Sequence, residues 1–414
     1  MSFDQAEVVR FYEKHPYPYR PAGHGDDSSL IGIPSDIRFI NHFIFSGTRD
    51  FTRPFRVLVA GGGTGDAVIG LGRQLALMQC PAELDYIDLS AKSREIAEGR
   101  ARDLGLVGAR FHTGRIQDLP ELAPGPYDYI DFCGVINHVG DQEEVLGVLA
   151  GLLAPGGGIG VMAYGQLGRT GVYHVQDMLR QAGAGQDDIG LARALLSALP
   201  ETNWHQRNAV FHNTAPEPDV EIADRYLNPS DRAFDVAELR DLARGAGMKI
   251  AAFAPPLMYD PVPFLEDPEL RRRIAALPWI ERCIFAEKFN GDICMHNFYM
   301  VAEATVTRPD ALLEAKNAIP IMISVPAGQA PQIINGGFGI TMRCGPLVRK
   351  MTLPGTDQSP HILRAIDGQK TLQQIHRSMP GGLSWRAFQR EFALVYRGLN
   401  GVGEMVLSTT PIPR

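Results

Sequence analysis

A short run of glycines between two apolar segments is the feature of this chain with the clearest chemical meaning. Residues 56–72 read RVLVAGGGTGDAVIGLG, so an apolar run leads into Gly61, Gly63 and Gly65, and Asp66 opens a segment with helical spacing. This order of strand, glycine turn and helix is typical of the first crossover of a nucleotide-binding α/β sheet. Glycines allow a sharp turn and a close approach to a ligand, although many tight turns carry the same pattern without one.

The spacing of the glycines and of the next acid narrows the ligand class. The loop has neither the G-x-G-x-x-G spacing of pyrophosphate binders nor the Gly-Lys-Ser/Thr of a phosphate-binding P-loop. Residues 84–87 read as the next strand, which ends in Asp88 about 20 residues after Gly65, where an acid commonly binds ribose hydroxyls. A ribose-binding acid without a phosphate loop favours a nucleoside.

Five motifs in this order resemble those of the class I S-adenosylmethionine-dependent methyltransferases and together span about residues 55–165. They are VLVAGGGTGD (57–66), YIDLS (86–90), FHTGRIQDLP (111–120), YDYIDFCGVINHV (127–139) and LLAPGGG (152–158). The resemblance implies an α/β fold, a Rossmann-like seven-stranded mostly parallel sheet. It also implies S-adenosylmethionine as methyl donor, S-adenosylhomocysteine as product, and no metal ion.

The resemblance assigns cofactor contacts residue by residue. The glycine loop faces the methionine part, the second motif the ribose, the third the adenine, and the fourth the exit of its strand. The predicted cofactor-binding residues are Gly61, Gly63, Gly65, Asp66, Asp88, Leu89, Ile116, Gln117, Cys133, Gly134 and, from the N-terminal segment, Tyr17.

The chain departs from the family pattern at two positions. Val59 stands where the family often has an acid that contacts the methionine amine through water, so Asp66 or the N-terminal segment is expected to supply that contact. Arg115 stands where the family often has an aspartate that reads the adenine amine, and Gln117 or Asp118 is the expected substitute.

Methyl transfer from a sulfonium is an in-line displacement in which the protein mainly aligns an acceptor lone pair with the methyl carbon. His138, just after the fourth strand, is the candidate base, and Tyr164 at the end of the fifth strand is the second candidate catalytic residue. Asn137 is expected to help align the acceptor. A capping or packing histidine is an equally good interpretation of His138.

The segment before the glycine loop is predicted to form an arm with lid helices, residues 1–54. Val8, Phe11 and Tyr12 fit one helical face, and the prolines in HPYPY force an extended path after it. Tyr12, Tyr17 and Tyr19 are candidates for a lid over the cofactor and acceptor, with plain packing of the arm as the alternative. Pro34 to Phe45 is predicted to be an amphipathic helix capped by Ser35.

Residues 55–304 are the predicted methyltransferase domain, with residues 166–232 as a helical insertion that shapes the acceptor site. Helices are expected over 172–181 and 189–197, because a structureless loop of that length is improbable. The candidate acceptor-binding residues are Tyr19, Asn137, Tyr173, His174 and Tyr226. The alternative for Tyr226 is a salt-bridged structural turn, Asp224-Arg225-Tyr226.

Residues 305–414 are predicted to form a small α+β domain that resembles winged-helix-like accessory modules. A linking helix is expected over 309–319, followed by strands and by three helices near 361–366, 372–378 and 385–400. Similar folds bind a leader segment in some peptide-modifying systems, and similar modules are appended to bacterial protein lysine methyltransferases. A structural or dimerising appendage is the favoured alternative.

Composition limits the partners. A net charge of −7 gives no general attraction to nucleic acid, and no apolar run approaches the ~18 residues of a membrane span. The five cysteines are widely spaced, which predicts reduced thiols in a cytoplasmic protein without a zinc site. A homodimer is left open.

We expect methyl transfer to a protein or peptide side chain, with nitrogen favoured. The alternatives are methylation of a small molecule or natural product on oxygen or nitrogen, and a non-catalytic nucleoside-binding sensor.

Overall fold

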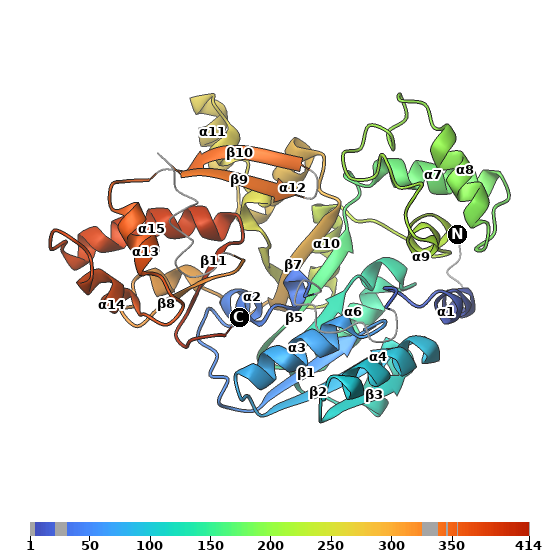
Figure 1. The fold of residues 1–414 in the computed structure, drawn as a ribbon, viewed down its shortest axis with the longest axis horizontal. Coiled ribbons are helices and arrows are strands. Elements are labelled where there is room, and N and C mark those ends of the chain that lie inside the picture. Colours follow the sequence, from blue (N-terminus) through green and yellow to red (C-terminus); the bar gives the residue numbers. More distant parts are fainter. Residues whose placement is uncertain (1–4, 21–30, 325–337, 345–346, 354, 414) are drawn as a thin grey trace.

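A seven-stranded sheet in the order β3-β2-β1-β4-β5-β7-β6 forms the centre of the molecule (Figure 1). The computed structural model describes residues 5–20, 31–324, 338–344, 347–353 and 355–413. The strands are β1 (Phe55–Ala60), β2 (Ala82–Asp88), β3 (Ala109–Thr113), β4 (Tyr127–Cys133), β5 (Leu153–Tyr164), β6 (Met248–Phe253) and β7 (Met295–Ala302). In this sheet β7 runs antiparallel to both of its neighbours, β5 and β6, and all other neighbouring strands are parallel. The predicted Rossmann-like, mostly parallel sheet is confirmed.

The central strands are buried on both faces, as their continuous apolar runs require. Side chains of α2, α3 and α4 pack on one face, and side chains of α6, α10 and α12 pack on the other. The bounds of these helices are α2 (Ile37–Phe43), α3 (Asp66–Leu77), α4 (Ala91–Asp103), α6 (Gln142–Gly151), α10 (Val236–Gly245) and α12 (Trp279–Asn290). Two short helices, α5 (Leu119–Leu122) and α11 (Pro268–Ala275), lie in the connections.

The strand order reverses between β1 and β4, which are parallel neighbours. In open α/β sheets the crevice outside the carboxyl ends of such strands is where ligands bind. The glycine loop follows β1 and residues 134–138 follow β4, so both predicted motifs meet at this crevice.

The insertion is helical, as predicted, and has its own apolar core. It contains α7 (Thr170–Gln181), α8 (Ile189–Ala198), α9 (Asp219–Ile222) and a π-helix (Ala223–Leu227). The N-terminal helix α1 (Gln5–Lys14) packs against α4 and lies on the same side of the molecule as the insertion (Figure 1).

The C-terminal region, drawn orange to red in Figure 1, lies on the opposite side of the molecule from the insertion. It has an apolar core of its own. Ile319, Ile321 and Val406, from a two-stranded sheet of this region, belong to the apolar cluster that also contains α2. Its elements are β8 (Ile319–Met322), β9 (Phe338–Cys344), β10 (Leu347–Leu353), α13 (Ser359–Ala365), α14 (Leu372–Arg377), α15 (Trp385–Gly401) and β11 (Met405–Ser408). The three helices were expected here, whereas the winged-helix resemblance and the domain limits stay predictions.

Two local predictions were wrong. The helix over 309–319 is only a 3₁₀ turn at Pro309–Leu313, because Pro320 disfavours helix at the residue before it and the chain is already strand at Ile319. Asp36, not Ser35, caps α2 by accepting a hydrogen bond from the Arg38 backbone N–H at 2.9 Å. None of the helices in the described segments is long and apolar enough to cross a membrane.

Candidate active site

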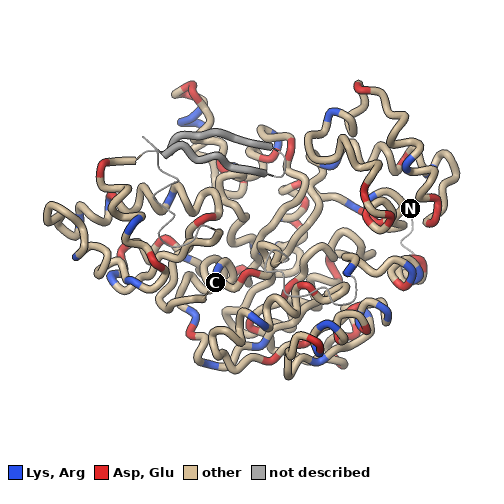
Figure 2. Tube along the Cα trace, viewed as in Figure 1, with Lys and Arg blue, Asp and Glu red and all other residues tan. Residues whose placement is uncertain are grey.

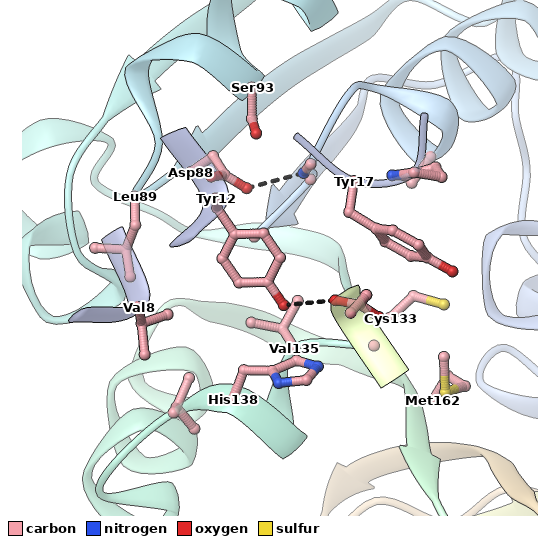
Figure 3. A pocket seen from close by; sticks show the side chains of 18 of the residues that line it. Val8, Tyr12, Tyr17, Asp88, Leu89, Ser93, Cys133, Val135, His138 and Met162 are labelled. Carbon is pink, nitrogen blue, oxygen red and sulfur yellow. Dashed lines mark hydrogen bonds between the residues drawn. The ribbon is translucent and has the colours of Figure 1, made fainter. Parts of the chain in front are cut away.

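A cavity of about 560 Å³ lies at the carboxyl ends of β1 and β4, within the range of small-molecule sites. The glycine loop, the arm, the strand ends and the insertion all contribute to its wall (Figure 3). Twelve of the predicted site residues line it, namely Gly61, Gly63, Asp66, Asp88, Leu89, Ile116, Gln117, Cys133, Gly134, Tyr17, His138 and Tyr164.

The glycine loop needs glycine for close backbone packing. Gly63 has φ +51°, and a Cβ there would lie 2.4 Å from the carbonyl oxygen of Tyr17. Gly65 has φ +103°, and a Cβ there would lie 2.8 Å from the Cβ of Ala97 on α4. Gly65 therefore serves the turn into α3 and does not itself line the cavity, whereas Gly63 lets the arm close onto the loop.

Asp88 is positioned by the backbone at the end of β2. Its Oδ2 accepts from the Gly63 N–H at 2.8 Å and its Oδ1 accepts from the Ser90 N–H at 2.9 Å. Burial raises the pKa of the Asp88 carboxyl to about 6, and the two backbone donors oppose this rise. A carboxylate has about four acceptor sites, so this one can still accept from a pair of hydroxyls.

Asp66 is held by cations of the protein. It forms ion pairs with Arg20 of the arm and, at 2.8 Å, with Arg100 of α4. Thr64 ties the arm to the loop as well, because its hydroxyl donates to the Pro18 carbonyl at 2.7 Å and its N–H donates to the Tyr17 carbonyl at 3.2 Å. The arm and the glycine loop thus form one connected unit.

The two predicted adenine-reading substitutes differ in position. Gln117 lines the cavity, with its Nε2 donating to Glu144 at 3.1 Å. Asp118 does not line the cavity, and its Oδ1 accepts a hydrogen bond from Nη2 of Arg115 at 2.6 Å. Gln117 is the better placed of the two.

His138 stands on a 3₁₀ turn (Ile136–His138) between two tyrosine rings. The rings of Tyr12 and Tyr164 approach it edge-on, with centroids 6.1 and 5.8 Å away. Its Nδ1 faces the Ser230 carbonyl oxygen, which only accepts, so Nδ1 carries the proton of the neutral ring. The Nε2 atom then has the lone pair that a base requires.

Asp224 is a functional candidate that the sequence analysis missed. It comes from the π-helix, is 7% exposed and lines the cavity. The Tyr12 hydroxyl donates to its Oδ1 at 3.3 Å, and the Asn228 amide bonds to both groups at 3.0 and 3.2 Å. Burial raises the pKa of its carboxyl. A π-helix within a helical turn is a signal often found at functional sites, but the sequence pattern does not reveal it.

Arg169 is a second lining residue that the sequence analysis missed. Its guanidinium lies 3.7 Å from the ring centroid of Tyr164 and pairs with Asp231 at 3.2 Å. This stacking fixes the Tyr164 ring at the cavity wall.

Five predicted acceptor residues lie outside the cavity lining. Tyr19 is 63% exposed, and His174 is on the exposed face of α7. The other three make structural bonds: Asn137 to the Arg232 carbonyl, Tyr173 to Asp231, and Tyr226 to His205. Helical periodicity turns His174 toward solvent and Tyr173 toward the body of the insertion. The acceptor role of these five residues stays a prediction.

The residues present fit the predicted cofactor. Bare glycine backbone, a buried carboxylate at the end of β2 and an apolar wall are what a nucleoside with a flexible tail requires. Asp88 would hold the ribose, Gly61 and Gly63 the methionine part, and Gln117 with Ile116 the adenine. The cofactor supplies an activated methyl group.

Comparison with known proteins agrees with this site. A family described as a methyltransferase domain matches residues 58–159. An uncharacterised protein of Synechococcus sp. is 27% identical over 304 residues, which are 71% of this chain and 70% of that protein.

Two solved structures share the fold over nearly the whole chain. PKMT2 from Rickettsia typhi has a TM-score of 0.67 at 16% identity, with 95% of this chain and 77% of that chain covered. The same protein in complex with AdoHcy has a TM-score of 0.63 at 17% identity, with 94% and 77% covered. The family match runs from β1 into β5, so this chain contains a methyltransferase domain on a Rossmann-like sheet, and the two solved structures share that fold.

Proposed function

We propose that this methyltransferase transfers the methyl group to an amine nitrogen of a protein or peptide side chain. The observation that carries the proposal is Asp224, a buried carboxylate at the cavity beside His138. No ion pair is recorded for it within the described segments. Arg169 and His138 oppose the rise in its pKa without forming an ion pair with it. A buried carboxylate that no cation contacts is costly, and an acceptor ammonium would remove that cost.

The rings around Asp224 favour the same acceptor. Tyr12, Tyr17 and Tyr164 line the cavity together with it, and the faces of aromatic rings attract cations. Glu221 adds a second carboxylate, which accepts from the Tyr17 hydroxyl at 3.4 Å, although Arg225 lies 3.6 Å from it. Asp224 is therefore the carboxylate available to an amine.

The reaction follows from this arrangement. The nitrogen lone pair attacks the methyl carbon in line with the carbon–sulfur bond, which breaks, and its electron pair stays on the sulfur. Before this attack the bound ammonium passes one proton to Nε2 of His138, whose Nδ1–H is held by the Ser230 carbonyl, and this transfer frees the lone pair on the nitrogen. Asp224 steadies the positive charge on nitrogen before and after transfer.

The size of the acceptor is argued from the rest of the chain. The likeness in fold to PKMT2 extends over the insertion and the C-terminal region. Similar appended modules occur in bacterial protein lysine methyltransferases, which supports a bulky acceptor. Figure 2 shows acidic and basic residues interspersed over the described chain. The absence of a nucleic-acid partner stays a prediction. The cytoplasmic location and the homodimer stay predictions.

The acceptor class is tested with a radiolabelled methyl donor and host lysate separated by size. We expect label in the protein fraction, stable to mild alkali as N-methyl groups are. Label confined to small molecules would instead support the alternative, a small-molecule or natural-product methyltransferase.

Asp224→Asn tests the cation site directly. We expect kcat/KM for the acceptor to fall about 10–100-fold, while the affinity for S-adenosylhomocysteine stays within twofold. Asp219→Asn is the matched control, since Asp219 is an exposed acid of the same insertion. Equal activity of Asp224→Asn and wild type would remove the argument for an amine.

A further inference from the structure

Asp131 is a buried acid of the cavity that the acceptor chemistry does not use. It lies in the last half of β4, is 1% exposed and lines the cavity with Gly32, Ser35 and Cys133. The Ser35 hydroxyl donates to its Oδ2 at 2.6 Å. Burial raises the pKa of this carboxyl to about 6.

Other acids of the sheet have partners that Asp131 lacks. Asp66 is paired with two arginines, and Asp85 accepts from Arg110 at 2.7 Å. No ion pair joins Asp131 to any residue of the described ranges. The fold thus retains a carboxylate inside the cofactor cavity whose charge is balanced by no protein cation, an arrangement that is costly without a cationic ligand.

The register of the sheet places this carboxylate beside the glycine loop. Asp131 on β4 is the direct partner of Val59 on β1, two residues before Gly61. Val59 and Tyr129 pack in the same apolar cluster, so Val59 and Asp131 belong to the same face of the sheet. Val59 is the position at which this chain lacks the acid expected to contact the methionine amine.

We propose that Asp131 binds the α-ammonium group of the methionine part of S-adenosylmethionine, directly or through one water. In this chain the acid stands on β4, beside the position on β1 where the family often has it, and the Ser35 hydroxyl orients it. Asp66, the earlier candidate, is left to its role between Arg20 and Arg100. The proposal rests on the assignment of the cofactor and is independent of the acceptor.

Two ligands that differ in the amino-acid tail test this role. S-adenosylhomocysteine carries the α-ammonium group, whereas 5′-methylthioadenosine keeps the nucleoside and thioether but lacks the tail. We expect Asp131→Asn to weaken S-adenosylhomocysteine about 10–100-fold by calorimetry and to change 5′-methylthioadenosine by less than threefold. The asparagine keeps the shape and can still accept from Ser35.

Asp66→Asn serves as the matched control. It removes the charge of the earlier candidate acid, and if Asp131 binds the ammonium group, Asp66→Asn should change the ratio of the two affinities less than Asp131→Asn does. An unchanged affinity of Asp131→Asn for S-adenosylhomocysteine, or an equal loss for both ligands, would overturn the proposal.

Ser35→Ala keeps the test decisive if Asp131→Asn does not fold. This variant leaves the carboxylate but removes the hydroxyl that orients it. We expect a selective loss of about 3–10-fold for S-adenosylhomocysteine alone. Absence of that selectivity in a folded Ser35→Ala variant, checked by circular dichroism, counts against Asp131.

Discussion

At the scale of single residues, the carboxylates of the site differ in the groups that contact them. Asp88 is held by backbone N–H groups and Asp66 by arginines, whereas Asp224 and Asp131 accept hydrogen bonds from neutral donors, with Arg169 and His138 near Asp224 but not in an ion pair with it. A carboxylate with a full set of cations is structural, whereas a buried one with neutral donors retains affinity for a cation or a hydroxyl. This difference, which depends on neighbours distant in sequence, assigns a different role to each acid.

Asp88→Ala should weaken S-adenosylhomocysteine at least tenfold. The change removes the acceptor for the ribose hydroxyls and also frees the Gly63 N–H that Asp88 holds. Calorimetry measures the affinity, with Asp177→Ala as control, since Asp177 is an exposed acid of α7 that does not line the cavity. Similar affinities of the Asp88 variant and wild type would contradict the ribose contact.

His138→Gln should lower kcat about 10²–10⁴-fold and leave S-adenosylhomocysteine affinity nearly unchanged. Glutamine can keep a hydrogen bond to the Ser230 carbonyl but cannot take a proton. Single-turnover rates measure the effect, because they report the chemical step separately from product release. His212→Gln, on the exposed surface of the insertion, is the control. A wild-type rate would leave His138 as a packing residue.

At the scale of elements, hydrogen bonds and an ion pair join the arm to the glycine loop beside the cavity. Residues 17–20 reach the loop through Thr64 and Asp66, and α1 carries Tyr12 to the cavity. The prediction of a tyrosine lid is supported by the positions of Tyr12 and Tyr17, whereas Tyr19 points to solvent.

Arg20→Ala should loosen the contact between the arm and the glycine loop. We expect S-adenosylhomocysteine to dissociate about 3–10-fold faster, because Asp66 loses one of its two cations while the ligand contacts of the loop remain. Stopped-flow fluorescence measures the rate. Arg53→Ala, an exposed arginine of the loop before β1, is the control. Equal rates for both variants would mean that the arm only packs.

At the scale of the whole molecule, the C-terminal region is joined to the sheet through α2. Nδ1 of His42, on α2, lies 3.2 Å from the carbonyl oxygen of Leu407 on β11. Nε2 of His42 lies 3.0 Å from the hydroxyl oxygen of Tyr396 on α15. Burial lowers the pKa of His42 to about 4. The joint therefore requires the neutral imidazole.

This joint predicts a loss of stability in acid. Because the unfolded chain binds the His42 proton near pH 6.5 and the folded chain only near 4, the free energy of unfolding should fall as pH drops through this window. The loss from His42 between pH 7 and 5 is about 2 kcal/mol. Urea denaturation at both pH values measures it, and His42→Gln should show a correspondingly smaller pH dependence. Equal dependence in the variant would assign the acid sensitivity elsewhere.

Much of the fold could be predicted because its signals are local. Apolar runs buried on both faces, the glycine turn, and capping residues such as Thr371 and Ser384 depend on neighbours a few residues away. The failures were local conflicts: Pro320 ended the linking helix early, and Asp36 displaced Ser35 as a cap.

The ribose part of the cofactor site could be predicted from the amino-acid sequence alone, because the spacing from Gly61 to Asp88 depends on one strand–helix–strand unit. The positions of Asp131 and Asp224 follow only from the folded chain. Strand register brings Asp131 beside Val59, and a π-helix from the insertion brings Asp224 to Tyr12 across more than two hundred residues of chain. Such contacts follow from packing between distant segments, which no periodicity within either segment encodes.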